Sequence, residues 1–327
     1  MNIVHVGYGY WGSNIVKNLV RAKDVNLTAI CDMNSSQLVR AKSVYGDKIS
    51  YENSHTAFLN NPDVDAFILA VQTDPSFEMA KDILNAGKHL FIEKPIATNA
   101  ERARVLTDLA KSKGLILHCD HIMIYHPVIR YIKKMIDSGE MGDITNIEVY
   151  RANLGPIRRD VTAMMDLAVH DVAVVNYLTG SREPLSVHAV GETMYGRQEA
   201  LTFLTIKYNG FIVHIKSSWV SPVKDRITMV CGTKKMAVFD DTRSENKLSV
   251  FDCGLVKKEE NDQFALYDYS VRNDGVVFPE IRQEDALLNS IEHFVNCVKT
   301  NTHSLSDGEQ STRIMKILDE AHRCMRG

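Results

Sequence analysis

The sequence lacks the features that mark several large classes of protein. Its six cysteines form no Cys-x-x-Cys pair and are irregularly spaced, which argues against a disulfide framework and is typical of reduced thiols in the cytoplasm. No apolar run approaches the length of a membrane span. The first residues lack the cationic start and the cleavage site of a signal peptide. We therefore expect a cytoplasmic protein that does not bind membranes.

An excess of charge of one sign is also missing. Lysine and arginine number 38, aspartate and glutamate number 41, and the net charge is −3. Without a basic block, the sequence offers no electrostatic footprint for nucleic acid. The 327 residues are 45% hydrophobic, which is typical of a globular protein too long for one small core. We expect two domains, residues 1–120 and residues 121–327, with the C-terminal helices packing back on the first domain.

A glycine-rich turn follows the first apolar run. Residues 3–6 predict a short strand, and helical spacing begins shortly after the turn. In the pattern G-x-G-x-x-G, the first glycine permits a tight turn, the second lets the backbone approach a pyrophosphate, and the third lets helix and strand pack closely. The helix N-terminus then supplies free N–H groups to the phosphates. The turn consists of Gly7, Tyr8, Gly9, Tyr10, Trp11 and Gly12.

An acidic residue ends the second predicted strand, residues 27–31. Asp32 lies about twenty residues after Gly12, where a carboxylate would accept hydrogen bonds from the adenosine ribose of a dinucleotide. A carboxylate at this position repels a 2′-phosphate, and the nearest arginine in sequence is Arg40. The pattern therefore predicts NAD as the cofactor and makes NADP the less favoured alternative.

Strands and helices alternate through the first third of the chain. Such alternation predicts a parallel sheet with right-handed crossovers, whose ligands bind beyond the carboxyl ends of the strands. The predicted strands cover residues 64–71, 89–92 and 115–118, and the predicted helices cover 75–86 and 99–113. Three loops leave the carboxyl ends, at residues 7–12, 72–75 and 93–95. We expect Gln72 and Thr73 to lie on the nicotinamide side of the cofactor.

The tripeptide Glu93-Lys94-Pro95 follows the strand at 89–92. Together with the glycine turn and Asp32, it resembles the Gfo/Idh/MocA oxidoreductase family, named after glucose–fructose oxidoreductase and inositol dehydrogenase. The resemblance implies a Rossmann domain followed by an α+β domain with a large open antiparallel sheet. It also implies that Lys94 reaches both cofactor and substrate and that Pro95 follows a cis peptide. Many members carry a histidine where this chain has Phe77, so no role is expected there.

The run His118-Cys119-Asp120-His121 looks at first like a metal cluster. Strand periodicity sends alternate side chains to opposite faces, so the four cannot converge on one ion. We therefore predict no metal. The segment instead resembles the crossover between the two domains of family members that act on sugars, and His121 is a candidate substrate contact.

Alternating apolar residues from Ile144 onward predict a sheet of antiparallel strands joined by short turns. Further predicted strands cover residues 185–190, 201–208, 211–220, 226–230 and 235–239, and two helices close the chain, at about 285–299 and 306–326. One face of such a sheet can cover a crevice and the other can pair with a second subunit, so we expect a homodimer or homotetramer. Residues 252–275 fit no predicted element.

Asp166 and His170 lie four residues apart in a predicted helix and share a face. A carboxylate one turn before an imidazole can orient it, and the imidazole can take a hydroxyl proton while a hydride leaves. An exposed polar pair would look the same in sequence. The family carries this D-x-x-x-H pattern on the equivalent helix, and the resemblance implies that His170 is the acid/base. Arg151, Asn153, Arg158 and Asp160 are candidate contacts to a diphosphate-linked sugar.

The leading hypothesis is an NAD-dependent oxidoreductase that moves a hydride between a sugar hydroxyl and nicotinamide. The substrate is expected to be a sugar or a nucleotide sugar, for example a UDP-N-acetylhexosamine oxidised at C3. Three alternatives remain: a dehydrogenase of a free sugar or inositol, a redox-neutral NAD-dependent glycosidase, and a non-catalytic cofactor-binding regulator.

Overall fold

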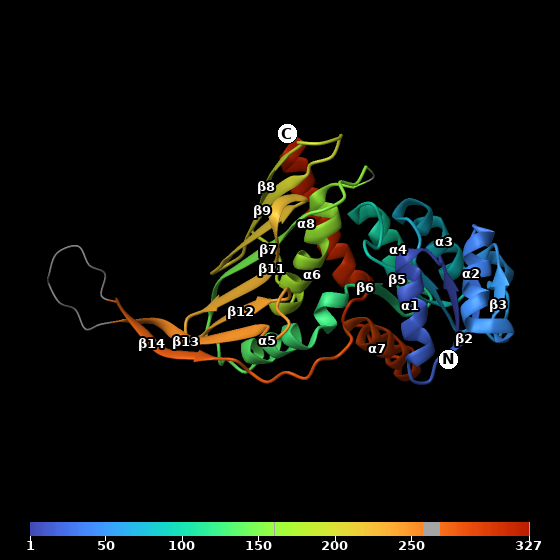
Figure 1. Cartoon of the computed structure of the whole chain (residues 1–327), viewed down its shortest axis with the longest axis horizontal. Coiled ribbons are helices and arrows are strands. Elements are labelled where there is room, and N and C mark those ends of the chain that lie inside the picture. The colour runs from blue at the N-terminus through green and yellow to red at the C-terminus, as the bar shows by residue number, and fades with distance from the viewer. Residues whose placement is uncertain (160, 258–268, 327) are drawn as a thin grey trace. The chain divides into compact units, whose positions relative to one another are not determined.

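The computed structural model describes residues 1–159, 161–257 and 269–326 of the chain. These residues form two compact units (Figure 1). The first contains Met1–His126 and Glu284–Asp319, and the second contains Pro127–Gln283 and the last residues from Glu320. The chain thus enters the first unit twice, because Glu284–Asp319 returns to it after the second unit is complete. No helix in the described part of the chain is long and apolar enough to cross a membrane.

The first unit is built on a six-stranded parallel sheet with the strand order β3-β2-β1-β4-β5-β6. The order reverses beside β1, which is the arrangement of a doubly wound dinucleotide fold. The strands are β1 (Asn2–Val6), β2 (Asn26–Cys31), β3 (Ser50–Glu52), β4 (Ala66–Leu69), β5 (His89–Glu93) and β6 (Leu117–Asp120). The helices of this unit are α1 (Tyr10–Arg21), α2 (Ser35–Tyr45), α3 (Thr73–Asn85), α4 (Ala100–Ser112), α7 (Ala286–Thr300) and the first part of α8 (Gly308–Arg326).

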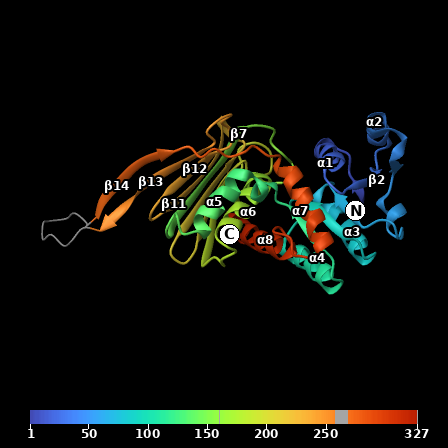
Figure 2. The same ribbon diagram turned by 90° about the horizontal axis from the view of Figure 1, so that it is seen from below.

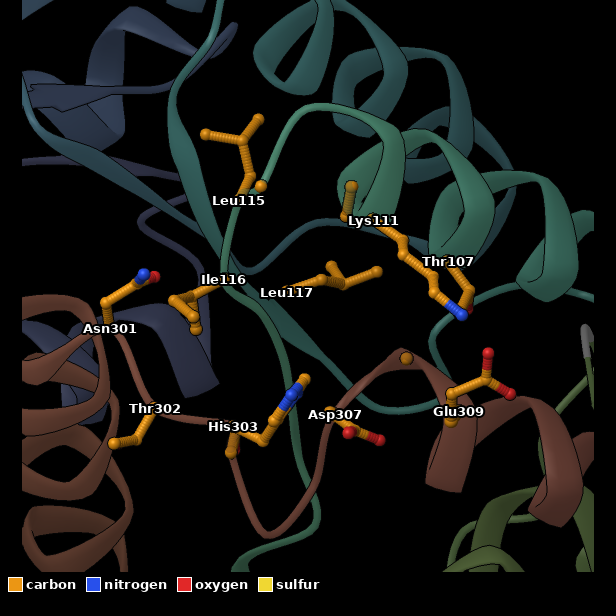
Figure 3. A pocket seen from close by; sticks show the side chains of 14 residues that line it. Thr107, Lys111, Leu115, Ile116, Leu117, Asn301, Thr302, His303, Asp307 and Glu309 are labelled. Atoms are coloured by element: carbon orange, nitrogen blue, oxygen red, sulfur yellow. The ribbon is translucent and has the colours of Figure 1, made fainter.

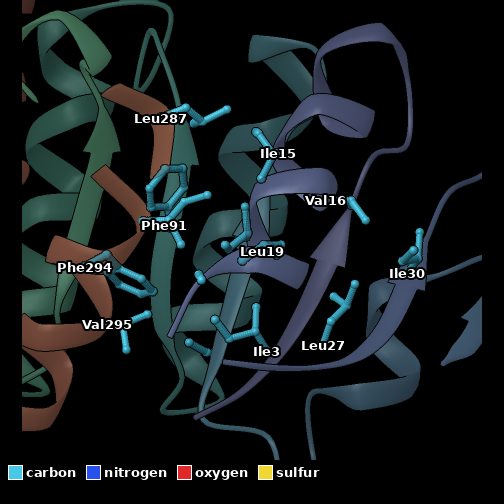
Figure 4. Packing of buried hydrophobic residues seen from close by; sticks show 14 of the residues in the cluster. Ile3, Ile15, Val16, Leu19, Leu27, Ile30, Phe91, Leu287, Phe294 and Val295 are labelled. Carbon is cyan, nitrogen blue, oxygen red and sulfur yellow. The ribbon is translucent and has the colours of Figure 1, made fainter. Parts of the chain in front are cut away.

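The core of the first unit joins segments from both ends of the chain (Figure 4). Ile3 of β1 and Leu19 of α1 are fully buried, as are Phe91 of β5 and Phe294 of α7. Phe91 and Phe294 pack edge to face, with ring centroids 5.7 Å apart, a favoured geometry for aromatic pairs. Helix α7 therefore completes the apolar layer that holds the sheet in place.

The second unit contains an eight-stranded sheet with the order β14-β13-β12-β11-β7-β10-β9-β8. All neighbouring strands are antiparallel except β7 and β10, which pair in parallel. Helices α5 (Pro127–Asp137) and α6 (Val169–Leu178) lie against one face of the sheet (Figure 2). The strands are β7 (Ile144–Leu154), β8 (Ser186–Glu192), β9 (Leu201–Lys207), β10 (Ile212–Ser218), β11 (Val220–Gly232), β12 (Met236–Asp240), β13 (Leu248–Lys257) and β14 (Tyr269–Val277).

The predicted fold class is confirmed, and several boundaries move. The strand predicted at residues 115–118 is β6, which runs two residues further, to Asp120. The residues that fitted no predicted element include parts of β13 and β14, which pair antiparallel at the edge of the second sheet. Polar and apolar residues mix in these two strands, so sequence periodicity is weak there.

Candidate active site

The glycine turn connects β1 to α1, and two of its glycines are required by close packing. Gly7 has a φ of +95°, which side chains rarely tolerate. A Cβ on Gly12 would come within 1.8 Å of the Gly7 carbonyl oxygen. The turn and the first helical residues are therefore pressed together by the absence of side chains at these two positions.

Gly9 serves a different purpose. It precedes α1 as its N-cap, and no side chain among the described residues caps the helix there. A Cβ on Gly9 would have no described atom within 4 Å. The helix thus begins without a capping side chain, and the space beside the Gly9 Cα is open, so these residues fit the pyrophosphate of a dinucleotide.

Asp32 follows β2 and is tied to the same turn. Its Oδ2 accepts the Tyr8 backbone N–H at 2.7 Å, and its Oδ1 accepts the Asn34 N–H at 2.8 Å. The carboxylate still has lone pairs for ribose hydroxyls. The distance of Arg40 in sequence suggested that it lies far from the turn, but the structure places it close by. Its guanidinium donates to the Tyr8 carbonyl at 2.8 Å and lies over the Tyr8 ring. Helix α2 brings it back to the turn.

A bond between Trp11 and Glu93 links the glycine turn to the Glu93-Lys94-Pro95 segment. The Trp11 indole N–H donates to Glu93 Oε1, and the Lys94 backbone N–H donates to Oε2 at 3.1 Å. The peptide between Lys94 and Pro95 is cis, as the family resemblance implied. Tyr10, in the same turn, is 86% exposed. Two of the three loops expected at the carboxyl edge of the sheet are thus in contact.

The third expected loop begins α3. Gln72 is exposed at the N-cap of this helix, and no described side chain caps it there. Thr73 is half-buried at the first helical position. Phe77, where many family members have histidine, is buried and is covered by the cationic groups of Lys81 and Arg102. Phe77 therefore packs the helix and cannot exchange protons.

Lys94 stands in a group of titratable residues at the ends of β5 and β6. Its charge opposes protonation of His121, and burial together with that charge lowers the pKa of His121 to about 3. Burial, followed by the neighbouring Glu93 carboxylate, raises the pKa of Asp120 well above its usual range. The protein packed around Glu93 raises its pKa as well. His121 is thus a neutral imidazole near pH 7, close enough to Lys94 for the lysine charge to lower its pKa.

His121 is almost completely buried, with its Nε2 3.4 Å from the Ser311 hydroxyl. Its Nδ1 has no hydrogen-bond partner among the described residues. His118, on the same segment, contacts the hydroxyls of Ser290 and Ser304 instead. Where the structure describes the chain, no group of three His, Cys, Asp or Glu side chains could hold a metal ion.

In the second unit, Asp166 belongs to a π-helical turn, Met164–Ala168, that leads into α6. Such turns are rare in proteins overall, and those that occur are often found at functional sites. The Arg158 guanidinium donates to Asp166 Oδ1 at 3.1 Å, so two of the predicted site residues meet. His170 lies one residue into α6 and is half-buried.

Arg151 has a partner that the sequence did not indicate. On β7 it is only 9% exposed, and its guanidinium binds both carboxylate oxygens of Asp171, at 2.6 to 3.0 Å. Asp171 follows His170 in α6, and its carboxylate pairs with Arg151. Asn153 is half-buried near the end of the same strand. Asp160 lies outside the described residues.

Sequence reasoning missed Asp120 as a member of the site. The signal was present, because Asp120 and Glu93 are both acidic residues that end apolar strands. Placing the end of the strand at His118 hid the fact that the two carboxylates occupy equivalent positions.

The family is shown by comparison with known proteins. Residues 1–121 match the oxidoreductase family with an NAD-binding Rossmann fold, GFO_IDH_MocA, and residues 129–238 match the GFO/IDH/MocA C-terminal domain. The chain therefore belongs to the Gfo/Idh/MocA family. It is an oxidoreductase whose first unit is an NAD-binding Rossmann fold.

Its relatives include sugar and cyclitol dehydrogenases. The UDP-N-acetylglucosamine 3-dehydrogenase of Acidithiobacillus ferrooxidans is 27% identical over 255 residues, which cover 77% of this chain and 76% of that protein. Its solved structure matches with a TM-score of 0.83 at 22% identity, covering 99% of this chain and 97% of that one. The myo-inositol 2-dehydrogenase of Thermotoga maritima is 24% identical over 94% of this chain and 91% of its own length.

A structure with bound cofactor shares the fold. GenD2 from gentamicin A biosynthesis, in complex with NAD, matches with a TM-score of 0.81 at 19% identity, covering all of this chain and 94% of that one. At such identities the structural matches establish the shared fold. They do not establish the substrate of this chain, which has to be argued from its own residues.

Proposed function

We propose that the protein oxidises a sugar hydroxyl, or reduces the corresponding ketone, with a nucleotide sugar as substrate. One observation carries the catalytic part of this proposal. The bond from Trp11 to Glu93 ties the dinucleotide turn to the segment that holds Lys94, so Lys94 belongs to the cofactor edge of the sheet. A lysine there can donate a hydrogen bond to the oxygen of the reacting carbon.

The roles divide among three residues. His170 removes the hydroxyl proton, Asp166 orients its imidazole, and Lys94 donates a hydrogen bond to a substrate oxygen on which negative charge develops. Bound NAD supplies the hydride acceptor. Arg158 sets the position of Asp166 through its ion pair at 3.1 Å. Gly9, the α1 N-terminus and Asp32 would hold the pyrophosphate and the adenosine ribose.

The substrate is proposed to be a UDP-N-acetylhexosamine oxidised at C3. Support comes from the A. ferrooxidans relative, which carries out that reaction by its name and matches three quarters of this chain. Arg158 is the exposed cation of the predicted substrate set, with 44% of its side chain accessible, and an arginine suits a diphosphate. The runner-up is inositol or a free sugar, which the T. maritima relative favours.

The test is turnover of NAD with a panel of UDP-sugars, free hexoses and inositols. Lys94→Ala and His170→Ala should each lower kcat/KM by about a hundredfold or more. The matched controls, Lys17→Ala and His188→Ala, change an exposed lysine and an exposed histidine and should leave kcat/KM unchanged. Near-normal rates in the first two variants would refute the mechanism. Glycoside cleavage without net NADH would favour the glycosidase, and cofactor binding without any turnover would favour the regulator.

The protein is also proposed to act in the cytoplasm as a homodimer or homotetramer. The exposed side chains Val190 of β8 and Phe203 of β9 are directly paired across the second sheet, and they are the apolar part of a face suited to a second copy. Light scattering after size exclusion tests this proposal, and Phe203→Asp should shift the protein toward the monomer.

A further inference from the structure

Glu93 and Asp120 occupy directly opposed positions in the sheet. They are Cα partners in the parallel ladder of β5 and β6, so their side chains leave the same face about 4.8 Å apart at the backbone. Both are the last residues of their strands. Two acidic side chains are therefore held next to each other at the cofactor edge, although they are far apart in sequence.

Hydrogen-bond donors satisfy three of the four carboxyl oxygens. Glu93 receives the Trp11 indole N–H on Oε1 and the Lys94 backbone N–H on Oε2. Asp120 receives the Ser290 hydroxyl on Oδ1 at 2.7 Å. Its Oδ2 has no partner among the described residues, although Asp120 is completely buried. A buried carboxylate oxygen without a donor is costly, whereas a proton on it could be donated toward Glu93.

The described residues around the two carboxyls contribute neutral groups and the cation Lys94. On β6, burial lowers the pKa of His118 well below its usual range and that of His121 to about 3, so both rings are neutral near pH 7. Burial raises the pKa of the Cys119 thiol, which also stays neutral. From α7, Ser290 faces Asp120, and His293 lies behind His118 with ring centroids 6.3 Å apart. From α8, Ser311 faces His121. Lys94 is the cation that acts on both acids.

We propose that Glu93 and Asp120 share one proton, so that the pair presents a single negative charge to Lys94. Two like charges this close cannot both ionise cheaply, and the second proton stays bound. The proton resides on Asp120, because Glu93 has two donors and Asp120 has one. The raised pKa of Asp120, caused by burial and then by Glu93, agrees with this assignment.

The pair gives Asp120 a positioning role in the reaction proposed above, and this part of the inference rests on that function. A single negative charge keeps Lys94 close without neutralising it through two strong ion pairs. Lys94 can then offer hydrogen bonds to the substrate oxygen. Protonated Asp120 acts through Glu93 and does not touch the substrate.

Infrared spectroscopy of the purified full-length protein at pH 7 tests the proton directly. The wild type should show the carbonyl stretch of a protonated carboxyl, and Asp120→Asn should lose it. Ser290→Ala should keep the band but move it, because the hydroxyl that donates to Asp120 is gone. The matched controls are Asp241→Asn, which changes a carboxylate paired with Lys247 at 2.8 Å, and Ser249→Ala, which changes another buried serine. Neither should affect the band.

The proposal is overturned if the wild type lacks the band or if Asp120→Asn retains it. Either result is independent of turnover, so failure of the proposed sugar chemistry would not be mistaken for failure of the shared proton. The positioning role has its own readout. Asn carries an N–H that can replace the proton toward Glu93, so Asp120→Asn should keep turnover within about threefold, whereas Asp120→Ala should lose about tenfold or more. Equal losses in both variants would refute that role.

Discussion

The indole N–H of Trp11 donates to the carboxylate of Glu93, although 82 positions separate the two residues. This contact connects the turn after β1 with the end of β5 and brings the glycine turn and the segment containing Lys94 to one edge of the sheet.

Two glycines of the turn should respond differently to a methyl group. In Gly9→Ala the added Cβ faces open space, so the thermal midpoint should hardly move. The methyl group occupies the approach of the pyrophosphate, and the Kd for NAD should rise about tenfold, equivalent to roughly 1.4 kcal/mol. In Gly12→Ala the Cβ would lie 1.8 Å from a carbonyl oxygen, and stability should fall by about 1–3 kcal/mol. Calorimetric NAD titration and thermal unfolding separate the two effects; a destabilised Gly9→Ala would contradict this reading.

Asp32→Ser should change the cofactor preference. Loss of a charged acceptor for the ribose costs about 1.5–3 kcal/mol, so the Kd for NAD should rise more than tenfold, while repulsion of a 2′-phosphate disappears. Arg40, held beside Tyr8, then becomes the nearest cation. The ratio of the NADP and NAD dissociation constants is the measurement. Adding Arg40→Gln should reverse any gain in NADP affinity, and an unchanged ratio in Asp32→Ser would show that the carboxylate does not face the ribose.

Arg151→Met should destabilise the second unit, because it leaves Asp171 buried without its partner. Breaking a buried ion pair from one side costs about 3–5 kcal/mol. The sequence contains two tryptophans, Trp11 in the first unit and Trp219 in the second. In a Trp11→Phe background, the fluorescence of Trp219 therefore follows denaturation of the second unit. A variant of normal stability with a raised KM would instead support the original expectation that Arg151 contacts the substrate.

Acid should destabilise the first unit through His121. Its pKa is lowered to about 3 by burial and by Lys94, whereas an unfolded histidine has a pKa of about 6.5. Below about pH 6.5 the unfolded chain binds a proton that the folded unit does not, so stability falls as the pH drops. Between pH 6.5 and pH 5 the loss should be about 2 kcal/mol from this residue. Urea unfolding at both pH values, followed by Trp11 in a Trp219→Phe background, measures it. His121→Gln should remove that part of the loss, and an unchanged pH dependence would exclude His121 as the source.

The contrast between β5 and β6 shows where the periodicity of apolar residues predicts the end of a strand and where it does not. The apolar run before Glu93 predicts the end of its strand to within one residue, since β5 includes Glu93 itself. The run before Asp120 contains a histidine and a cysteine, so the strand seemed to end early, and the side-by-side carboxylates remained hidden. Hydrogen bonding to β5 and burial against α7 extend β6 to Asp120, and neither is visible in a local window.

Arg151 illustrates a second limit. In a strand of alternating polar and apolar residues, an arginine is interpreted as an exposed charge or as a ligand contact. Its actual partner, Asp171, stands in a helix twenty positions away. The helix itself begins with a π turn, which no composition rule distinguishes from an ordinary helix.

The sequence by itself determined the family, the dinucleotide turn, the parallel sheet and the identity of the candidate lysine, because these depend on local patterns of glycine, apolar residues and charge. Only the tertiary structure decided which polar groups meet. In the structure Arg40 binds the glycine turn, Arg151 forms an ion pair with Asp171, and Glu93 lies opposite Asp120 in the sheet. These contacts depend on strand register and on how helices pack against the sheet. Both are set by packing between segments distant in sequence, so neither segment alone shows a periodic pattern that predicts the contact.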